Sequence, residues 1–200
     1  MSNWSIETAA PADAAVAGDL IARAFGELPA AVWLVAEPAS RARMLAGQFA
    51  LLVEHALGYG TVSWIGDGGA RLGVAVWFDR TTAIPEPPEY ERRLAAICGE
   101  ATPRFQILDE LLEAHHPTEP HQHLALLAVD PAQHGRGFGT ALLEHQHARL
   151  DSHGVPAYLE ASSEGSRDLY ARHGYRVGEP FHLPGGPPFW PMWREASAGR

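Results

Sequence analysis

The sequence predicts an α/β fold with a mixed β-sheet flanked by helices. One observation is a strand over residues 121–129 that leads through a glycine-rich turn into a helix over residues 137–153 and a strand over residues 157–161. This β-α-β pattern joins parallel strands. The second observation is a pair of segments, residues 60–65 and 71–78, that are rich in β-branched and aromatic residues. The turn sequence GDGGA separates them, which indicates an antiparallel hairpin.

The first part of the chain predicts one short strand and two amphipathic helices. Residues 4–8 have the composition of a strand. Apolar residues recur at helical spacing over residues 11–25 and again over residues 39–57, so we expect each segment to bury one face against the sheet. Residues 26–38 between them are expected to form a loop with several large apolar side chains.

The segment IPEPPEY should end the hairpin, because proline cannot donate a hydrogen bond to a sheet. Residues 88–98 and 103–115 are then expected to be two helices that cap the sheet. Thr102, which precedes Pro103, is expected to be the N-cap of the second helix.

The last part of the chain predicts a short helix over residues 166–173 and two closing strands, 175–180 and 189–194, around a Gly-Gly turn. The chain has no internal repeat, linker or low-complexity run. We therefore expect a single domain over residues 1–200.

Composition limits the classes of function. A hydrophobic content of 46% supports one sizeable core, and the net charge of -9 disfavours a nucleic-acid partner and favours a cationic one. The single Cys98 excludes an intrachain disulfide, and no apolar stretch is long enough for a membrane helix. We expect a cytoplasmic protein that has no membrane partner and is a monomer or a homodimer.

The glycine-rich turn is the strongest functional signal. In HLALLAVDPAQHGRGFGTALLEHQ, Gly135, Gly137 and Gly139 lie between a strand and a helix, where unpaired amides at a helix N-terminus bind phosphate. A dinucleotide motif does not fit, because Thr140 stands where its third glycine should be. A P-loop does not fit either, because its lysine is missing.

The turn resembles the acetyl-coenzyme A-binding loop of the GNAT superfamily. The family pattern V-x-P-x-x-[Q/R]-x-x-G-x-[G/A] reads here V-D-P-A-Q-H-G-R-G-F-G, and only His134 departs from it. The segment GVPAYLEASSEGSRDLYARHGYRVGE is similar to the following strand, helix and strand. AFGELPAAVWLVAEP and HHPTEPHQHLALLAVDP are similar to antibiotic-modifying members of the puromycin N-acetyltransferase type.

The resemblance implies a GNAT fold, a largely antiparallel central sheet that splays at a parallel pair formed by its fourth and fifth strands. It implies acetyl-coenzyme A as co-substrate and Tyr170 as the acid that protonates the departing thiolate. A tyrosine hydroxyl stays protonated near neutral pH, as that task requires. The residues expected to contact the cofactor are Leu127, Val129, His134, Gly135, Arg136, Gly137, Phe138, Gly139, Thr140 and Ser166.

The general base is left open between His123 and Glu160. Strict alternation along a strand puts His121, His123, Ala125, Leu127 and Val129 on one face, the face that the family uses for substrate and cofactor. A neutral histidine suits proton abstraction near pH 7. Glu160, at the end of its strand, is the alternative, and it can also attract a cationic substrate or cap the next helix.

Two residues of the 26–38 loop, Glu27 and Trp33, are candidates for contact with the acceptor. No metal is expected, because the histidines between residues 115 and 123 lack a HExxH-type spacing and an obvious carboxylate partner on one face. A serine hydrolase is disfavoured because no GxSxG motif occurs.

The predicted function is transfer of an acetyl group to a primary amine of a small molecule, such as an antibiotic or metabolite, by direct attack on the thioester. Two alternatives remain. One is an acyl-coenzyme A-binding sensor with little turnover, and the other is a protein or peptide N-acetyltransferase.

Overall fold

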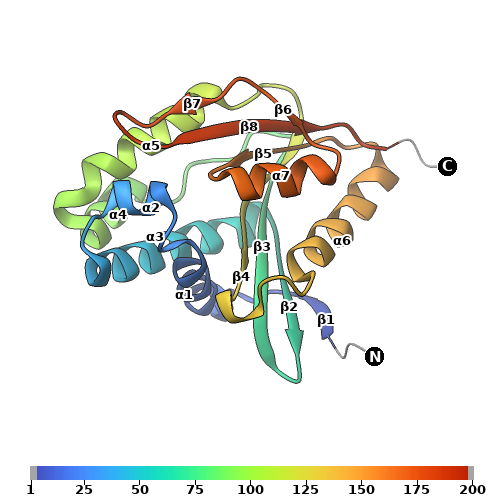
Figure 1. The fold of residues 1–200 in the computed structure, drawn as a ribbon, viewed down its shortest axis with the longest axis horizontal. Coiled ribbons are helices and arrows are strands. Elements are labelled where there is room, and N and C mark those ends of the chain that lie inside the picture. Colours follow the sequence, from blue (N-terminus) through green and yellow to red (C-terminus); the bar gives the residue numbers. More distant parts are fainter. Residues whose placement is uncertain (1–3, 198–200) are drawn as a thin grey trace.

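The computed structural model describes residues 4–197 of the chain (Figure 1). The strands are β1 (Trp4–Thr8), β2 (Gly60–Asp67), β3 (Ala70–Arg80), β4 (His121–Val129), β5 (Ala157–Ala161), β6 (Arg176–Val177), β7 (Phe181–His182) and β8 (Pro188–Arg194). The α-helices are α1 (Ala14–Phe25), α2 (Pro29–Leu34), α3 (Pro38–Tyr59), α4 (Tyr90–Cys98), α5 (Thr102–His115), α6 (Phe138–His153) and α7 (Glu164–Arg172). None of the helices in residues 4–197 is long and apolar enough to cross a membrane.

The strands form one mixed sheet in the order β1-β2-β3-β4-β5-β8-β6, and β7 adds to β8. All neighbouring strands are antiparallel except β4 and β5. The parallel pairing is short: Gln122 pairs with Ala157 and His123 with Tyr158, and then the two strands separate. We call the opening between residues 124–129 of β4 and residues 159–161 of β5 the splay. The predicted fold class is confirmed.

Helices cover both faces of the sheet (Figure 1). On one face α1 and α3 pack on β2, β3 and β4 around Leu20, Leu45 and Trp64. On the other face α6 packs around Leu142 and Trp77. Helices α1 and α3 approach so closely that a Cβ on Gly18 would lie 2.4 Å from the Ala46 carbonyl oxygen, so glycine is required there.

Three local predictions are wrong. The expected loop 26–38 contains α2, which Pro29 begins and whose Ala30 and Ala31 are buried. The N-cap of α5 is Ala101, because Thr102 already has helical dihedrals and its hydroxyl donates to the Gly99 carbonyl at 2.7 Å. The expected strand 175–180 is reduced to β6, because Gly178 to Pro180 lie outside any strand.

The expected alternation along β4 is also wrong. Val76 pairs with Leu126 and Trp77 with Leu124, so a β-bulge leaves Ala125 without a partner. The extra residue reverses the faces beyond it. Leu127 and Val129 pack on the α6 side, whereas His123 lies before the bulge and stacks on Phe78 of the α3 side, with ring centroids 6.4 Å apart.

A buried histidine connects α6 to the C-terminal part of the chain. His147 is 6% exposed, and its Nε2 lies 3.0 Å from the Tyr175 hydroxyl. Burial lowers the pKa of His147 from 6.5 to about 4, with a further contribution from the nearby charge of Arg194. The folded protein therefore holds this imidazole neutral, while the unfolded chain takes up a proton below about pH 6.5.

We predict that the free energy of unfolding falls as the pH is lowered from 6.5 to 4. In that window the unfolded state binds more protons than the folded state, at roughly 1.4 kcal/mol for each unit of pKa difference. His147→Gln should reduce this pH dependence in urea unfolding, because glutamine can still bond Tyr175 but does not titrate. His145→Gln, an exposed change on the same helix, is the control. An unchanged pH dependence in His147→Gln would contradict the assignment.

Candidate functional site

A cavity of about 1610 Å³ runs through the splay. One end is lined by the glycine-rich loop between β4 and α6 and by the start of α7. The other end is lined by the inner sides of α3, α4 and α5. Both unpaired strand segments contribute to the wall between these ends, including Leu127, Val129 and Glu160. The cavity therefore connects the predicted cofactor loop to a second, more distant chamber.

The loop end of the cavity has the backbone geometry that phosphate binding requires. Gly135 and Gly137 have φ values of 76° and 82°, which side-chain-bearing residues rarely adopt. Helix α6 begins directly afterwards at Phe138, so its first amides have no partner inside the helix. The amides and the positive end of the α6 dipole fit the pyrophosphate of a coenzyme A molecule.

Most of the predicted cofactor residues line this end of the cavity. They are Leu127, Val129, His134, Gly135, Gly137, Phe138, Gly139, Thr140 and Ser166. His134 donates from Nε2 to the Val129 carbonyl oxygen at 3.0 Å, so its side chain braces the loop. The Ser166 hydroxyl donates to the Ser163 carbonyl at 2.9 Å in the capping box of α7. Contact of these residues with a cofactor stays a prediction.

Arg136 does not line the cavity. Its guanidinium donates to the Gln133 side chain and lies over the Phe138 ring, 5.1 Å from the centroid. A phosphate contact would require this side chain to leave both partners. The predicted role of Arg136 is therefore untested.

Tyr170 lies on α7 with its ring in the core and lines the same cavity. None of the described residues forms a hydrogen bond with its hydroxyl, whereas the neighbouring Tyr175 hydroxyl is bonded to His147. Burial raises the pKa of Tyr170 well above its usual value of 10, so the phenol keeps its proton at any physiological pH.

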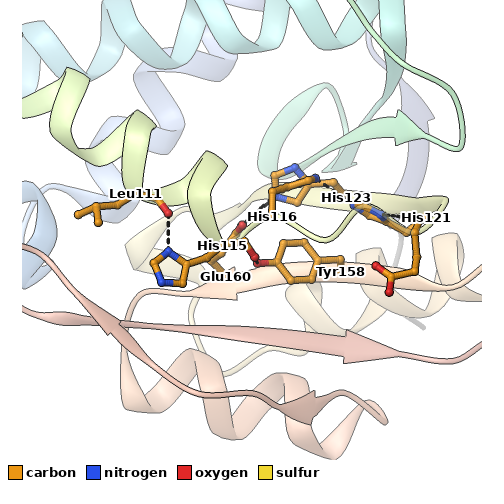
Figure 2. Close-up of polar contacts among 8 residues, drawn as sticks. Leu111, His115, His116, His121, His123, Tyr158 and Glu160 are labelled. Carbon is orange, nitrogen blue, oxygen red and sulfur yellow. Dashed lines mark hydrogen bonds and ion pairs between the residues drawn. The ribbon is translucent and has the colours of Figure 1, made fainter.

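A second polar cluster lies where β4 and β5 begin to separate (Figure 2). His123 of β4 and Glu160 of β5 meet, with 2.9 Å between Nε2 and Oε2. His116, just beyond α5, places Nδ1 3.7 Å from the other Glu160 oxygen. All three side chains line the cavity. Sequence reasoning named His123 and Glu160 as separate candidates and did not foresee that they form a pair.

The hydrogen bonds determine which nitrogen of each ring carries a proton. The His121 Nδ1 lies 2.7 Å from the Glu119 carbonyl and must donate, so the Nε2 of a neutral His121 accepts from His116 at 3.1 Å. Burial keeps His121 neutral by lowering its pKa to about 4. His116 therefore uses Nε2–H for His121 and turns Nδ1 to Glu160, to which Nδ1 can donate only when both ring nitrogens carry protons.

The same reasoning applies to His123. An ionised carboxylate only accepts hydrogen bonds, so the His123 Nε2 carries the proton that bonds Glu160. The remaining basic atom of a neutral His123 is then Nδ1. This nitrogen is buried and has no hydrogen-bond partner among the described residues.

Glu160 is almost fully buried, with 6% of its side chain exposed. Burial alone would raise the pKa of this carboxyl. The hydrogen bonds from His116 and His123, and the positive charge that His123 carries when both its ring nitrogens are protonated, outweigh that effect and lower the pKa to about 2. Glu160 is therefore ionised, and a carboxylate of such low basicity holds a proton poorly.

His116, His123 and Glu160 also form a group that can hold a metal ion, since one ligand atom from each lies within 4.8 Å of the others. The expectation that no carboxylate shares a face with these histidines is therefore wrong. The signal was present in the sequence, because Glu160 and His123 lie on the two strands of the predicted parallel pair. The predicted absence of a metal stays untested.

The two predicted acceptor contacts lie outside the cavity wall. Glu27 is 91% exposed at its side chain and pairs with Arg41 at 3.2 Å. Trp33, on α2, donates from its indole to the Pro184 carbonyl at 3.1 Å and packs against the β7–β8 hairpin. Contact of either residue with an acceptor remains a prediction that this geometry does not support.

Sequence reasoning missed the polar residues of the distant chamber. Asp109 of α5 accepts a hydrogen bond from the Tyr90 hydroxyl at 2.7 Å, and Gln48 of α3 lies beside them. A carboxylate between the apolar residues Leu108 and Leu112 was the signal that would have revealed this site.

Two kinds of known protein are similar to this chain: a protein family and several solved structures. Residues 105–177 match a family model described as an acetyltransferase (GNAT) domain. The structure of histone acetyltransferase HPA2 and related acetyltransferase from Corynebacterium glutamicum is similar at 27% identity and a TM-score of 0.75, covering 99% of each chain.

Two more distant likenesses bear on the fold. The polyamine N-acetyltransferase of Drosophila melanogaster has 16% identity and a TM-score of 0.64, covering 96% of this chain and 99% of that chain. The ribosomal-protein-S18-alanine N-acetyltransferase of Escherichia coli has 18% identity and a TM-score of 0.56, covering 98% and 96%.

The parallel pair that splays, the glycine-rich loop at its mouth and the matching family model lead to one conclusion. The chain has a GNAT fold, its residues 105–177 match the GNAT acetyltransferase domain, and these findings support an acyl-coenzyme A-dependent acyltransferase.

Proposed function

We propose that the protein transfers an acetyl group from acetyl-coenzyme A to the primary amine of a small molecule, by direct attack of the amine on the thioester. The observation that carries this proposal is the continuous cavity, which joins the glycine-rich loop, Tyr170 and the His123–Glu160 pair to the chamber under α5. Such a cavity accommodates a cofactor at one end and an acceptor at the other.

His123 is the general base of this proposal. The acceptor amine arrives as an ammonium and must lose a proton before its nitrogen can attack. The Nδ1 atom of His123 takes that proton, while the Glu160 carboxylate holds the ring through Nε2–H and stabilises the imidazolium. Glu160 acts through His123, since its own pKa of about 2 makes it a weak base.

Tyr170 is the general acid. Acetyl-coenzyme A supplies the thioester, whose carbon–sulfur bond breaks as the new carbon–nitrogen bond forms. The leaving sulfur then takes the phenolic proton of Tyr170, which burial keeps in place and which no described residue holds in a hydrogen bond.

An antibiotic acceptor of the puromycin type is one member of the proposed substrate class. A thiol-release assay with acetyl-coenzyme A and a panel of aminonucleosides, aminoglycosides, diamines, arylalkylamines and a peptide tests the class. Turnover of small amines supports the proposal. Turnover of the peptide alone indicates a protein N-acetyltransferase, and coenzyme binding without any turnover indicates a sensor; either result would contradict it.

We predict that Tyr170→Phe lowers kcat by about 10² to 10⁴-fold and leaves cofactor affinity nearly unchanged, because the ring and its packing remain while the proton donor is lost. Tyr175→Phe is the matched control: its hydroxyl is buried and bonded to His147, and it does not line the cavity. Single-turnover kinetics measure the chemical step. Full chemical rate in Tyr170→Phe would exclude Tyr170 as the acid.

Glu160→Gln should keep the hydrogen bond to His123 and remove the negative charge. The imidazolium then loses its stabilising partner, so we expect kcat/KM to fall by roughly 10²-fold and its acidic limb to move to lower pH. Glu164→Gln, an exposed change on α7, is the control. An unshifted acidic limb would show that Glu160 does not act on the base.

Gly139→Val should raise the Michaelis constant for acetyl-coenzyme A at least about tenfold, because the glycine lines the cavity where α6 begins and added bulk removes binding to both ground and transition states. The protein itself tolerates a Cβ there, since the nearest atoms would be 3.8 Å and 3.9 Å away. Thermal unfolding verifies that the variant is folded. Unchanged coenzyme A affinity in calorimetry would disprove the loop assignment.

A further inference from the structure

The chamber at the α5 end of the cavity carries an excess of negative charge. Six carboxylates line the cavity and only one guanidinium does, that of Arg80. The carboxylates are Glu86, Glu91, Asp109, Glu110, Glu113 and Glu160. Glu160 is paired with His123, whereas none of the other five forms an ion pair with a described residue, and of these five only Asp109 is not exposed.

Asp109 is the most enclosed of these five. It accepts a hydrogen bond from Tyr90, yet no Lys, Arg or His of the described residues forms an ion pair with it. Burial raises the pKa of its carboxyl to about 6, and the nearby Glu91 adds to this effect. A half-buried carboxylate without a cationic partner is stabilised by a cation that enters the chamber.

Gln48 provides an independent sign of a ligand. This side chain is 7% exposed and lines the cavity beside the Tyr90 hydroxyl. The Tyr90 hydroxyl donates to Asp109, so it can accept from only one amide N–H of Gln48 and leaves the other N–H and the amide oxygen free. Buried amide groups are nearly always bonded, so these remaining groups, in a side chain that lines the cavity beside a buried carboxylate, point to a polar group bound there.

The spacing along α5 relates this chamber to the reaction centre. Asp109 lies six residues before His115, the last residue of α5, which is roughly 9 Å at the rise of an α-helix. His116, which follows directly, contacts Glu160. Between the two positions, α5 lines the cavity with the apolar Leu112 and Ala114 and with Glu110 and Glu113, and Leu108 precedes Asp109 on the same wall.

We propose that Asp109, Tyr90 and Gln48 form a subsite for a second cationic group of the acceptor, so that the preferred acceptors are long α,ω-diamines or amines with a distal positive charge. One end reacts beside His123, the apolar middle lies along α5, and the far ammonium binds Asp109. This inference rests on the proposed function, and it makes the acidic α5 wall a determinant of specificity.

The test compares two acceptors, 1,8-diaminooctane and octylamine. Octylamine has the same carbon chain but only one amino group and therefore one charge. In the wild type kcat/KM should be about ten- to a hundredfold higher for the diamine, the factor expected for one charged hydrogen bond. Asp109→Asn keeps an acceptor for Tyr90 and should reduce this ratio to near one. Glu100→Gln, a charge-matched change outside the cavity, should retain it.

A wild-type ratio near one, or an unchanged ratio in Asp109→Asn, would overturn the subsite and leave the proposed transferase activity intact. The subsite can also be tested if the proposed transferase activity is absent. If no amine is acetylated, calorimetry with coenzyme A-saturated protein compares binding of the same two amines. Tighter binding of the diamine that is lost in Asp109→Asn supports the subsite, and equal binding of both amines overturns it.

Discussion

The separation of β4 from β5 is the constraint on which the site depends. Parallel pairing stops after His123 and Tyr158, so beyond that point the facing edges of β4 and β5 do not bond each other and line a cavity instead, while each strand stays paired to its other neighbour. Elsewhere the sheet is closed by antiparallel pairs and by helices on both faces. The interior is therefore open to a ligand where the adjacent strands β4 and β5 separate.

At the base of this opening, a carboxylate is held in the core by imidazoles. An isolated buried carboxylate would take up a proton, since desolvation disfavours its charge. Glu160 stays ionised because His123 and His116 supply charge and hydrogen bonds from two different elements. His121 takes part indirectly, because its bond to the Glu119 carbonyl decides which nitrogen it offers to His116. The hydrogen-bonding groups around Glu160 are thus arranged by a chain of contacts that begins at the Glu119 carbonyl, in a loop.

Much of the fold was predictable because the responsible signals are local. The glycine-rich turn between a strand and a helix gave the parallel pair, and the bounds of β1, β4 and β5 agree with the sequence prediction. Helix α2 was missed because six residues that begin with proline provide too little periodicity. Thr102 was misassigned as a cap because the preceding turn, Gly99 to Ala101, already continues into the helix.

The site was less predictable, because its geometry depends on long-range contacts. The bulge at Ala125 has no signature in the sequence, so strict alternation placed His123 on the same face as Val129. Likewise, the meeting of His116 with Glu160 requires the end of α5 to lie against β5. Glu27 and Trp33 were chosen from a segment that contains α2, and although Ala30, Ala31 and Leu34 of that helix line the cavity, Glu27 and Trp33 do not.

The bulge also determines which side chains of β4 lie on each face of the sheet. Before Ala125, β4 presents His123 towards α3 and α5; after it, the same strand presents Leu127 and Val129 towards α6 and the glycine-rich loop. The proposed function assigns recognition of the acceptor and retention of the cofactor to opposite sides of one strand and to different helices. Under that proposal, substitutions on α3, α4 and α5 are free to alter acceptor preference over evolutionary time, while the α6 side keeps the donor unchanged.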